Sequence, residues 1–176
     1  KAALTIIVFV GSVFSPYYYR ARRRHAGNPE NFCSVNAILY GPDRRRWSLT
    51  ERGAGDLKRG RDQIVIGPSR VEQSGDERFT FHIHEVCNPW PTRLSGQVEL
   101  SVPALGQRSF ELDPDGLHRW WPAAPAGRVK VTMKKPGIAW EGAAYLDCNA
   151  GVVPLEETFL NWHWQRSAAE AGSGHI

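Results

Sequence analysis

Cysteine is scarce in this sequence, and its pattern supports neither a disulfide framework nor a zinc site. The three cysteines, Cys33, Cys87 and Cys148, are an odd number, lie far apart and form no CxxC pair. Small domains of oxidising compartments usually carry paired cysteines. The sequence therefore favours a reducing compartment.

The short signatures of several enzyme classes are absent as well. The sequence has no GxSxG, P-loop, GxGxxG or HExxH, so hydrolase, kinase, dinucleotide-binding and zincin functions have no support. The apolar stretch from Ala2 to Phe14 is too short for a transmembrane helix, which needs about 20 residues, and Ser15-Pro16 is a poor signal-peptide cleavage site. The chain enters this stretch directly from Lys1, as we expect of a fragment that lacks both ends of a longer protein.

Positive charge is in excess but is confined to clusters. The net charge is +4, and much of the basic charge lies in residues 20–24 and 44–46. Nucleic-acid surfaces usually spread basic residues along a groove with aromatics between them, so we expect no nucleic-acid partner. The first cluster follows three tyrosines in a segment predicted to be a loop that can include a helical turn. This segment is either a solvated connector or a contact with a membrane surface. The residues of this second alternative are Tyr17, Tyr18, Tyr19, Arg20, Arg22, Arg23 and Arg24.

The sequence predicts mainly short β-strands. Glycine (17 residues) and proline (12 residues) punctuate the chain, and turns recur about every 8–12 residues, which is typical of a sandwich or barrel. The predicted strands cover 4–14, 32–41, 45–53, 63–75, 77–88, 96–104, 108–122 (a hairpin around Asp113-Pro114-Asp115-Gly116), 128–136 and 137–149. We expect an all-β antiparallel barrel or sandwich, left incomplete if the chain is a fragment. A barrel interior could hold one elongated apolar ligand.

One domain is expected over residues 1–166, with a junction of two halves near 103–116. Residues 155–165 have mixed spacing that fits a short helix or a closing strand. Residues 167–176 are polar and small and are predicted to be a flexible tail.

Two pairs of side chains could share a pocket. Tyr145 and Asp147 are two residues apart in a predicted strand, as are His118 and Trp120, so each pair projects from one strand face. Taken alone, Asp147 before Asn149 and Gly151 reads more simply as a turn former. The neighbouring aromatics favour function, because aromatic faces stabilise cations. They are Trp120, Trp121, Trp140, Tyr145, Trp162 and Trp164. In such an apolar pocket we expect Asp147 to be a buried, protonated acid.

Two other groups of polar residues have simpler explanations. His82 and His84 lie on one face of a predicted strand, but no third ligand stands at a suitable spacing, so we expect no metal site. Thr50-Glu51-Arg52 is either catalytic or an ion-paired turn, and the turn is the simpler interpretation.

Several longer motifs resemble one family. TIIVFVGSVFSPYY near the start, NxCxxNxxLYG from Asn31, TERG from Thr50, LHRWWP from Leu117 and YLDCNAGxxPLE from Tyr145 are similar to motifs of the carotenoid 1,2-hydratases, also called hydroxyneurosporene synthases, of carotenoid-making bacteria. The resemblance covers nearly the whole chain in order. Phe32 stands where the family pattern suggests histidine, and Val153 where it suggests an acidic residue.

This resemblance implies a β-rich, lipocalin-like and cofactor-free enzyme that is peripherally attached to the cytoplasmic side of a bacterial membrane. It would add water to the terminal C1–C2 double bond of acyclic carotenoids such as neurosporene and lycopene. By the same resemblance Asp147 is the proton donor, and His118, Trp120 and Tyr145 act with it, His118 orienting Asp147 or the attacking water. We expect Trp121 and Trp140 to bind substrate. The alternative is a lipocalin-like binding protein for a long apolar ligand, and a metal-dependent hydratase is a more distant one.

Overall fold

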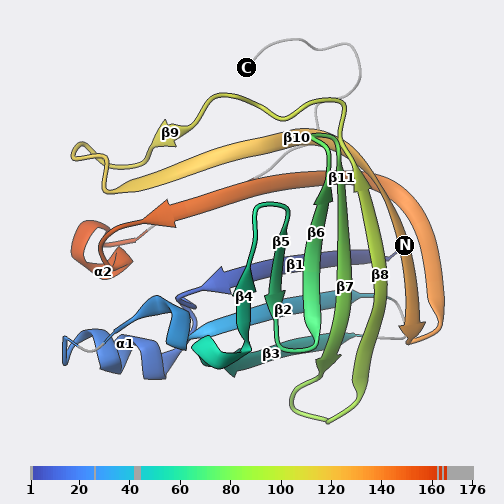
Figure 1. The fold of residues 1–176 in the computed structure, drawn as a ribbon, viewed down its shortest axis with the longest axis horizontal. Coiled ribbons are helices and arrows are strands. Elements are labelled where there is room, and N and C mark those ends of the chain that lie inside the picture. Colours follow the sequence, from blue (N-terminus) through green and yellow to red (C-terminus); the bar gives the residue numbers. More distant parts are fainter. Residues whose placement is uncertain (1, 26, 42–44, 162, 164, 166–176) are drawn as a thin grey trace.

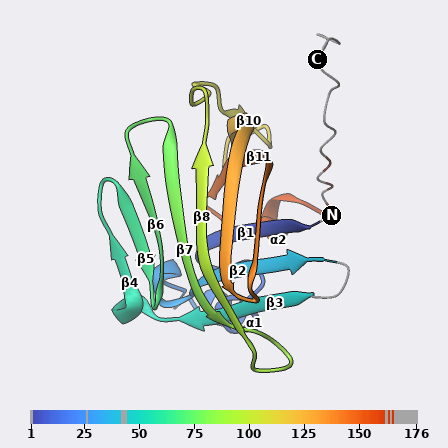
Figure 2. The same ribbon diagram turned by 90° about the vertical axis from the view of Figure 1, so that its right-hand side faces the viewer.

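The chain folds into two antiparallel β-sheets that run across one another (Figures 1 and 2). The computed structural model describes every residue except 1, 26, 42–44, 162, 164 and 166–176. The predicted tail, Trp162 and Trp164 therefore lie outside the described residues. The smaller sheet contains β1 (Ala3–Val10), β2 (Cys33–Tyr40) and β3 (Arg46–Arg52). The larger sheet contains β4 (Leu57–Arg59), β5 (Gln63–Ile66), β6 (Ser69–Ser74), β7 (Arg78–Val86), β8 (Arg93–Ser101), β9 (Phe110–Glu111), β10 (His118–Lys135) and β11 (Ile138–Gly151).

In the smaller sheet, exposed and partly buried side chains alternate along β1. Leu4, Ile6 and Val8 of β1 point to the space between the sheets, since side chains of a strand alternate between faces. In β2, Val35 and Leu39 are buried on the same side. The predicted hairpin of residues 32–41 with 45–53 is confirmed, with Val35 opposite Thr50.

The larger sheet has the order β11-β10-β8-β7-β6-β5-β4, with β9 added beside β10. The single strand predicted for 63–75 is wrong, because Gly67 has a φ of 56° and turns the chain into a β5–β6 hairpin. Gly96 of β8 lies so close to β10 that a Cβ would come 2.4 Å from the backbone oxygen of Thr132. The absence of a side chain at Gly96 therefore allows β8 and β10 to lie close together at this point.

Strand β10 joins two segments that the sequence presents as separate strands. It runs unbroken from His118 to Lys135 and bends over the end of the larger sheet together with β11 (Figure 1). Its second half pairs with β8, and its first half pairs with β9. The predicted hairpin around Asp113 is confirmed, with Trp120 opposite Phe110.

Two short helices lie beside the sheets. The segment after Phe14, predicted as a loop that can include a helical turn, is helical over α1 (Pro16–Arg22). The Ser15 hydroxyl accepts a hydrogen bond from the Tyr18 amide, and Pro16 suits the first helical turn. Helix α2 (Leu155–Thr158) follows β11. No helix in the described part of the chain is long and apolar enough to cross a membrane.

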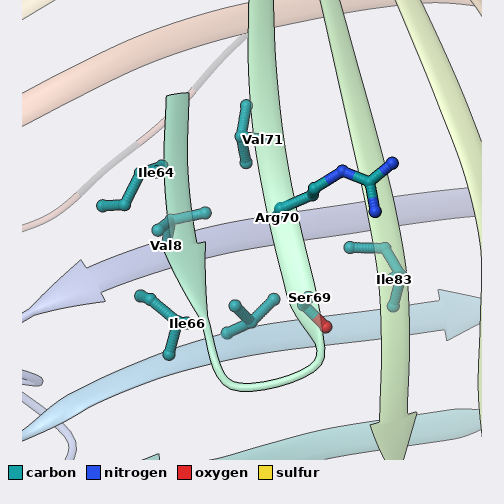
Figure 3. Close-up of a pocket in the computed structure, with 8 residues that line it drawn as sticks. Val8, Ile64, Ile66, Ser69, Arg70, Val71 and Ile83 are labelled. Atoms are coloured by element: carbon teal, nitrogen blue, oxygen red, sulfur yellow. The ribbon is translucent and has the colours of Figure 1, made fainter. Parts of the chain in front are cut away.

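Between the described strands of the two sheets, apolar side chains pack closely. Figure 3 shows Val8, Ile64, Ile66 and Ile83 around one pocket there. This pocket has no room for a water molecule. The branched residues of β1, β2, β5 and β7 fill this part of the interior, so an elongated apolar ligand would have to bind elsewhere on the protein.

The predicted all-β antiparallel class is confirmed, and the described strands form an open sandwich rather than a closed barrel. A buried ion pair links the two layers. The Arg52 guanidinium of β3 donates to Glu85 of β7 at 2.7 Å, and the Ser69 hydroxyl of β6 donates to the other Glu85 oxygen at 2.6 Å. Arg52 is therefore part of the inter-sheet packing.

Candidate active site on the β10–β11 pair

One face of the β10–β11 pair collects the residues that the sequence singled out. In β11 the side chains alternate regularly, so Tyr145 and Asp147 share a face. Trp120 lies opposite Asn149 and His118 lies opposite Gly151, and directly opposed residues of paired strands share a face. The structure therefore brings Asp147, Tyr145, Trp120 and His118 to one side of the pair.

Trp120 and Asp147 are in direct contact. The indole nitrogen of Trp120 donates a hydrogen bond to Oδ2 of Asp147 at 2.9 Å. The Trp120 ring also packs against Phe110 of β9, with centroids 5.6 Å apart. A carboxyl group is thus held beside an aromatic pair, which can stabilise a neighbouring positive charge.

The expectation that Asp147 is fully buried is wrong. Its side chain is half-buried, and so is that of Tyr145. The physical reason is the position of β11, which is the edge strand of the larger sheet, so that described strands flank it on one side only. The carboxyl group is therefore within reach of molecules outside the fold.

His118 is buried and held from two sides. Its Nδ1 atom lies 3.3 Å from Oδ2 of Asp113, and its Nε2 atom lies 3.1 Å from the backbone oxygen of Val153. The ring of Phe159 approaches edge-on, with centroids 4.9 Å apart. Both ring nitrogens of His118 therefore face oxygen atoms other than those of Asp147.

Asp113 is the group that sequence reasoning missed at this site. Its carboxylate accepts hydrogen bonds from the backbone amides of Asp115, Leu117 and His118, at 3.2, 3.1 and 2.7 Å. Burial raises the pKa of the Asp113 carboxyl, but these amides and the His118 ring together outweigh burial and leave the pKa below its usual value. The signal in the sequence was the aspartate that opens the turn five residues before His118.

The lowered pKa predicts a loss of stability in acid. A carboxyl whose pKa is lower in the folded chain contributes stability above its unfolded pKa of about 3.9, and that contribution disappears as the pH falls through the folded value. We expect the urea midpoint of the protein to drop in this acidic range. The drop should be smaller in Asp113→Asn than in the wild type. In Asp115→Asn it should be as large as in the wild type, because the Asp115 side chain is exposed. An equal drop in all three proteins would contradict the prediction.

Trp121 and Trp140 lie on the opposite face from Asp147. Trp121 follows Trp120 in β10 and lies opposite Cys148, whereas Trp140 lies opposite Val131 and packs against the core. Trp121 donates its indole hydrogen to the Gly106 backbone oxygen and borders an open depression of about 810 Å³. The single aromatic pocket expected from the sequence is thus divided between two faces.

The histidines of β7 are placed as polar surface residues. Nε2 of His82 lies 2.9 Å from Glu72, and His84 is exposed. Within the described ranges, no three His, Cys, Asp or Glu side chains are grouped so that they could hold a metal ion.

The fold and the site define a class: an antiparallel β-sandwich with a carboxyl group and aromatic side chains gathered at one end of a long strand pair. The chain belongs to the carotenoid hydratase CrtC family, whose sequence model matches residues 6–176. No solved structure matches the chain significantly.

Named relatives are similar over nearly the whole chain. The acyclic carotenoid 1,2-hydratase of Thiocapsa roseopersicina is 43% identical over 97% of this chain, and that of Rubrivivax gelatinosus is 45% identical over 95%. The corresponding protein of Rhodobacter capsulatus is 37% identical over 92%. The chain spans 42%, 41% and 56% of the length of these three relatives.

Proposed function

We propose that this chain carries the active site of an acyclic carotenoid 1,2-hydratase. The substrate would be an acyclic carotenoid such as neurosporene or lycopene, to which water is added at the terminal C1–C2 double bond without a cofactor. The observation that carries the proposal is the Trp120–Asp147 contact at 2.9 Å. It joins an acid to an aromatic ring in a chain of the carotenoid hydratase family.

The reaction needs a proton donor and a stabiliser of positive charge. Asp147 would give a proton to C2 of the alkene, and the π electrons of the double bond would form the new C–H bond, leaving a tertiary cation at C1. The rings of Trp120 and Tyr145 would face this cation. A water molecule would then bond to C1 and lose a proton to the Asp147 carboxylate, which restores the acid. Holding the alkene and the water molecule in the reacting orientation lowers the entropic part of the activation barrier.

The remaining predicted residues take other places in this proposal. His118 would orient the acid, because it lies two residues from Trp120 on the same face. Trp121 lies on the other face and borders an open depression, so it would meet the polyene chain of the substrate rather than its reacting end. Trp140 packs against the core and would support the strand pair rather than touch the substrate. The depression beside Trp121, about 810 Å³ in volume, offers room for such a chain.

A direct assay tests the proposed function. The purified chain is incubated with lycopene in detergent micelles, and the products are separated and weighed by mass spectrometry. We expect a product heavier by one water, with deuterium at C2 when the solvent is D₂O. If neither this chain nor a longer protein containing it gives the hydrated product, the proposed function is wrong.

We also propose a peripheral contact with the cytoplasmic face of a bacterial membrane, made by the segment around α1. Val13, Phe14, Tyr17 and Tyr19 are exposed apolar or aromatic side chains. The exposed cations beside them are Arg20, Arg23 and Arg24. Aromatic side chains favour the headgroup layer, and cations favour anionic lipids. Tyr18 and Arg22 would contribute less, because Tyr18 stacks on Phe32 and Arg22 pairs with Glu156 at 2.8 Å.

Vesicle binding checks this contact. The triple variant Arg20→Gln, Arg23→Gln and Arg24→Gln should bind phosphatidylserine vesicles more weakly, since each basic residue near such a surface contributes about 1 kcal/mol. The matched control replaces Lys130, Lys134 and Lys135 of β10, which are equally exposed, with glutamine. Binding is measured by co-sedimentation. An equal loss of binding in both triple variants would mean that vesicle binding depends on the net charge of the protein and not on the segment around α1.

A further inference from the structure

We infer that Asp113 is a positioning residue of the site, and that it acts through His118 to hold Trp120 and Asp147 in contact. This inference rests on the proposed function for its catalytic consequence, whereas its structural part stands on the contacts of the described residues. The carboxylate, the imidazole ring and the Val153 backbone oxygen form a line of contacts, which we call the His118 clasp.

On one side, the clasp is fixed by the turn before β10. The Asp113 carboxylate accepts from three backbone amides of its own turn, and the same Oδ2 atom faces both the amide and the ring of His118. The side chains of Asp113 and His118 are 2% and 4% exposed, so water does not compete strongly for these bonds. The carboxylate therefore sets the rotation of the ring.

On the other side, the clasp is fixed by the segment after β11. The Val153 oxygen faces Nε2, and a Cβ added at Gly151 would lie 2.6 Å from Cδ2 of His118. Phe159 closes the remaining side of the ring. Glu156 in this segment pairs with Arg22 of α1, so the segment is anchored at both ends. His118 thereby joins the start of β10 to the end of β11.

The position of His118 between the two strand ends affects the contact between Trp120 and the Asp147 carboxyl group. The pair His118–Gly151 ends the β10–β11 ladder, and the next pair on this face is Trp120–Asn149. If the ring moves, the two strand ends can separate, and the Trp120 indole then shifts relative to Asp147. Because both ring nitrogens face other oxygens, His118 is placed to hold the strands rather than to exchange protons with substrate.

Two variants disturb the clasp from opposite sides. Asp113→Asn keeps an oxygen for the backbone amides but removes the negative charge beside Nδ1. Gly151→Ala adds the Cβ that the ring would meet and leaves Asp113 untouched. The matched controls are Asp115→Asn, in the same turn, and Gly142→Ala, on the same strand, where an added Cβ meets nothing within 4 Å. The readout is the indole N–H signal of Trp120 in a ¹H–¹⁵N spectrum, assigned with Trp120→Phe.

We expect the Trp120 signal to move toward the position of a solvent-exposed indole in both clasp variants and to stay in place in both controls. The other tryptophan signals should keep their dispersion, which shows that the fold persists. In the hydration assay, kcat should fall by about tenfold to a hundredfold with KM within about twofold, as is typical of a misplaced catalytic group.

The possible outcomes distinguish the positioning role of Asp113 from the proposed hydratase function. An unmoved Trp120 signal in both clasp variants overturns the inference, whether or not the protein is a hydratase. A moved signal with unchanged kcat also overturns it, because Asp113 would then not position the reaction. If the Trp120 signal moves in the clasp variants, but neither the wild-type chain nor a longer protein containing it hydrates lycopene, the clasp is supported and the proposed function is wrong. If Asp113→Asn fails to fold, Gly151→Ala still tests whether the position of His118 sets that of Trp120, and an unmoved Trp120 signal in that variant overturns the inference.

Discussion

Replacing Asp147 with asparagine should lower the hydration rate by about 10²–10⁴-fold, the usual contribution of a general acid. Asparagine has nearly the same shape, and its amide oxygen can still accept the hydrogen bond from Trp120 that the carboxylate accepts at 2.9 Å. It cannot deliver a proton to the alkene. The loss should therefore appear in kcat, with little change in KM or in thermal stability.

The matched control for this variant is Glu141→Gln. Glu141 lies on the same strand, is exposed, and undergoes the same change from carboxylate to amide. Its rate should equal that of the wild type. Both variants are measured with lycopene in micelles and in lycopene-producing cells. Normal amounts of hydroxylated product from Asp147→Asn would show that another group is the acid.

Replacing Arg52 with methionine should lower the free energy of unfolding by about 3–5 kcal/mol, the usual cost of removing one partner of a buried ion pair. Glu85 is completely buried, and the Arg52 guanidinium neutralises it at 2.7 Å. Without Arg52, the Glu85 carboxylate keeps, among the described residues, the Ser69 hydroxyl as its hydrogen-bond partner. Urea denaturation monitored by tryptophan fluorescence measures the loss.

Two controls show whether the ion pair causes this loss. Arg59→Met removes an exposed arginine that lies 3.8 Å from Glu30, and it should change the stability by less than about 1 kcal/mol. The double variant Arg52→Met with Glu85→Leu removes both charges and should recover much of the stability, since apolar residues often replace buried pairs well. A double variant less stable than Arg52→Met would mean that the packing of Glu85 matters more than its charge.

Alternation and turn residues were enough to predict most of the strands. The hairpin around Asp113 follows from the turn residues Asp-Pro-Asp-Gly. The alternation of side chains along a strand also predicts that Tyr145 and Asp147 share one face, and that His118 and Trp120 share one face. These inferences succeed because they depend on neighbours close in sequence.

Other features depend on contacts between distant segments, which periodicity does not encode. Strand β10 is 18 residues long because β11 pairs with both of its halves. Between these halves, β10 has two register shifts relative to β11, each of which adds one bulged residue to β10. The division of Trp120 and Trp121 between two faces could have been predicted, since they are consecutive. The burial of Glu85 could not, because its partner Arg52 comes from the other sheet.

The length of β10 also has a consequence for local unfolding. Its second half lies between β8 and β11 at the centre of the larger sheet, whereas its first half has only the two-residue β9 on one side. Amide hydrogens of residues 128–135 should therefore exchange with solvent only in global opening, and those near Trp120 in smaller and more frequent openings. The end of the strand pair that carries Trp120 and Asp147 can thus open locally while the rest of the sandwich stays folded. Under the proposed function, a rigid polyene would then enter and leave without unfolding of the core.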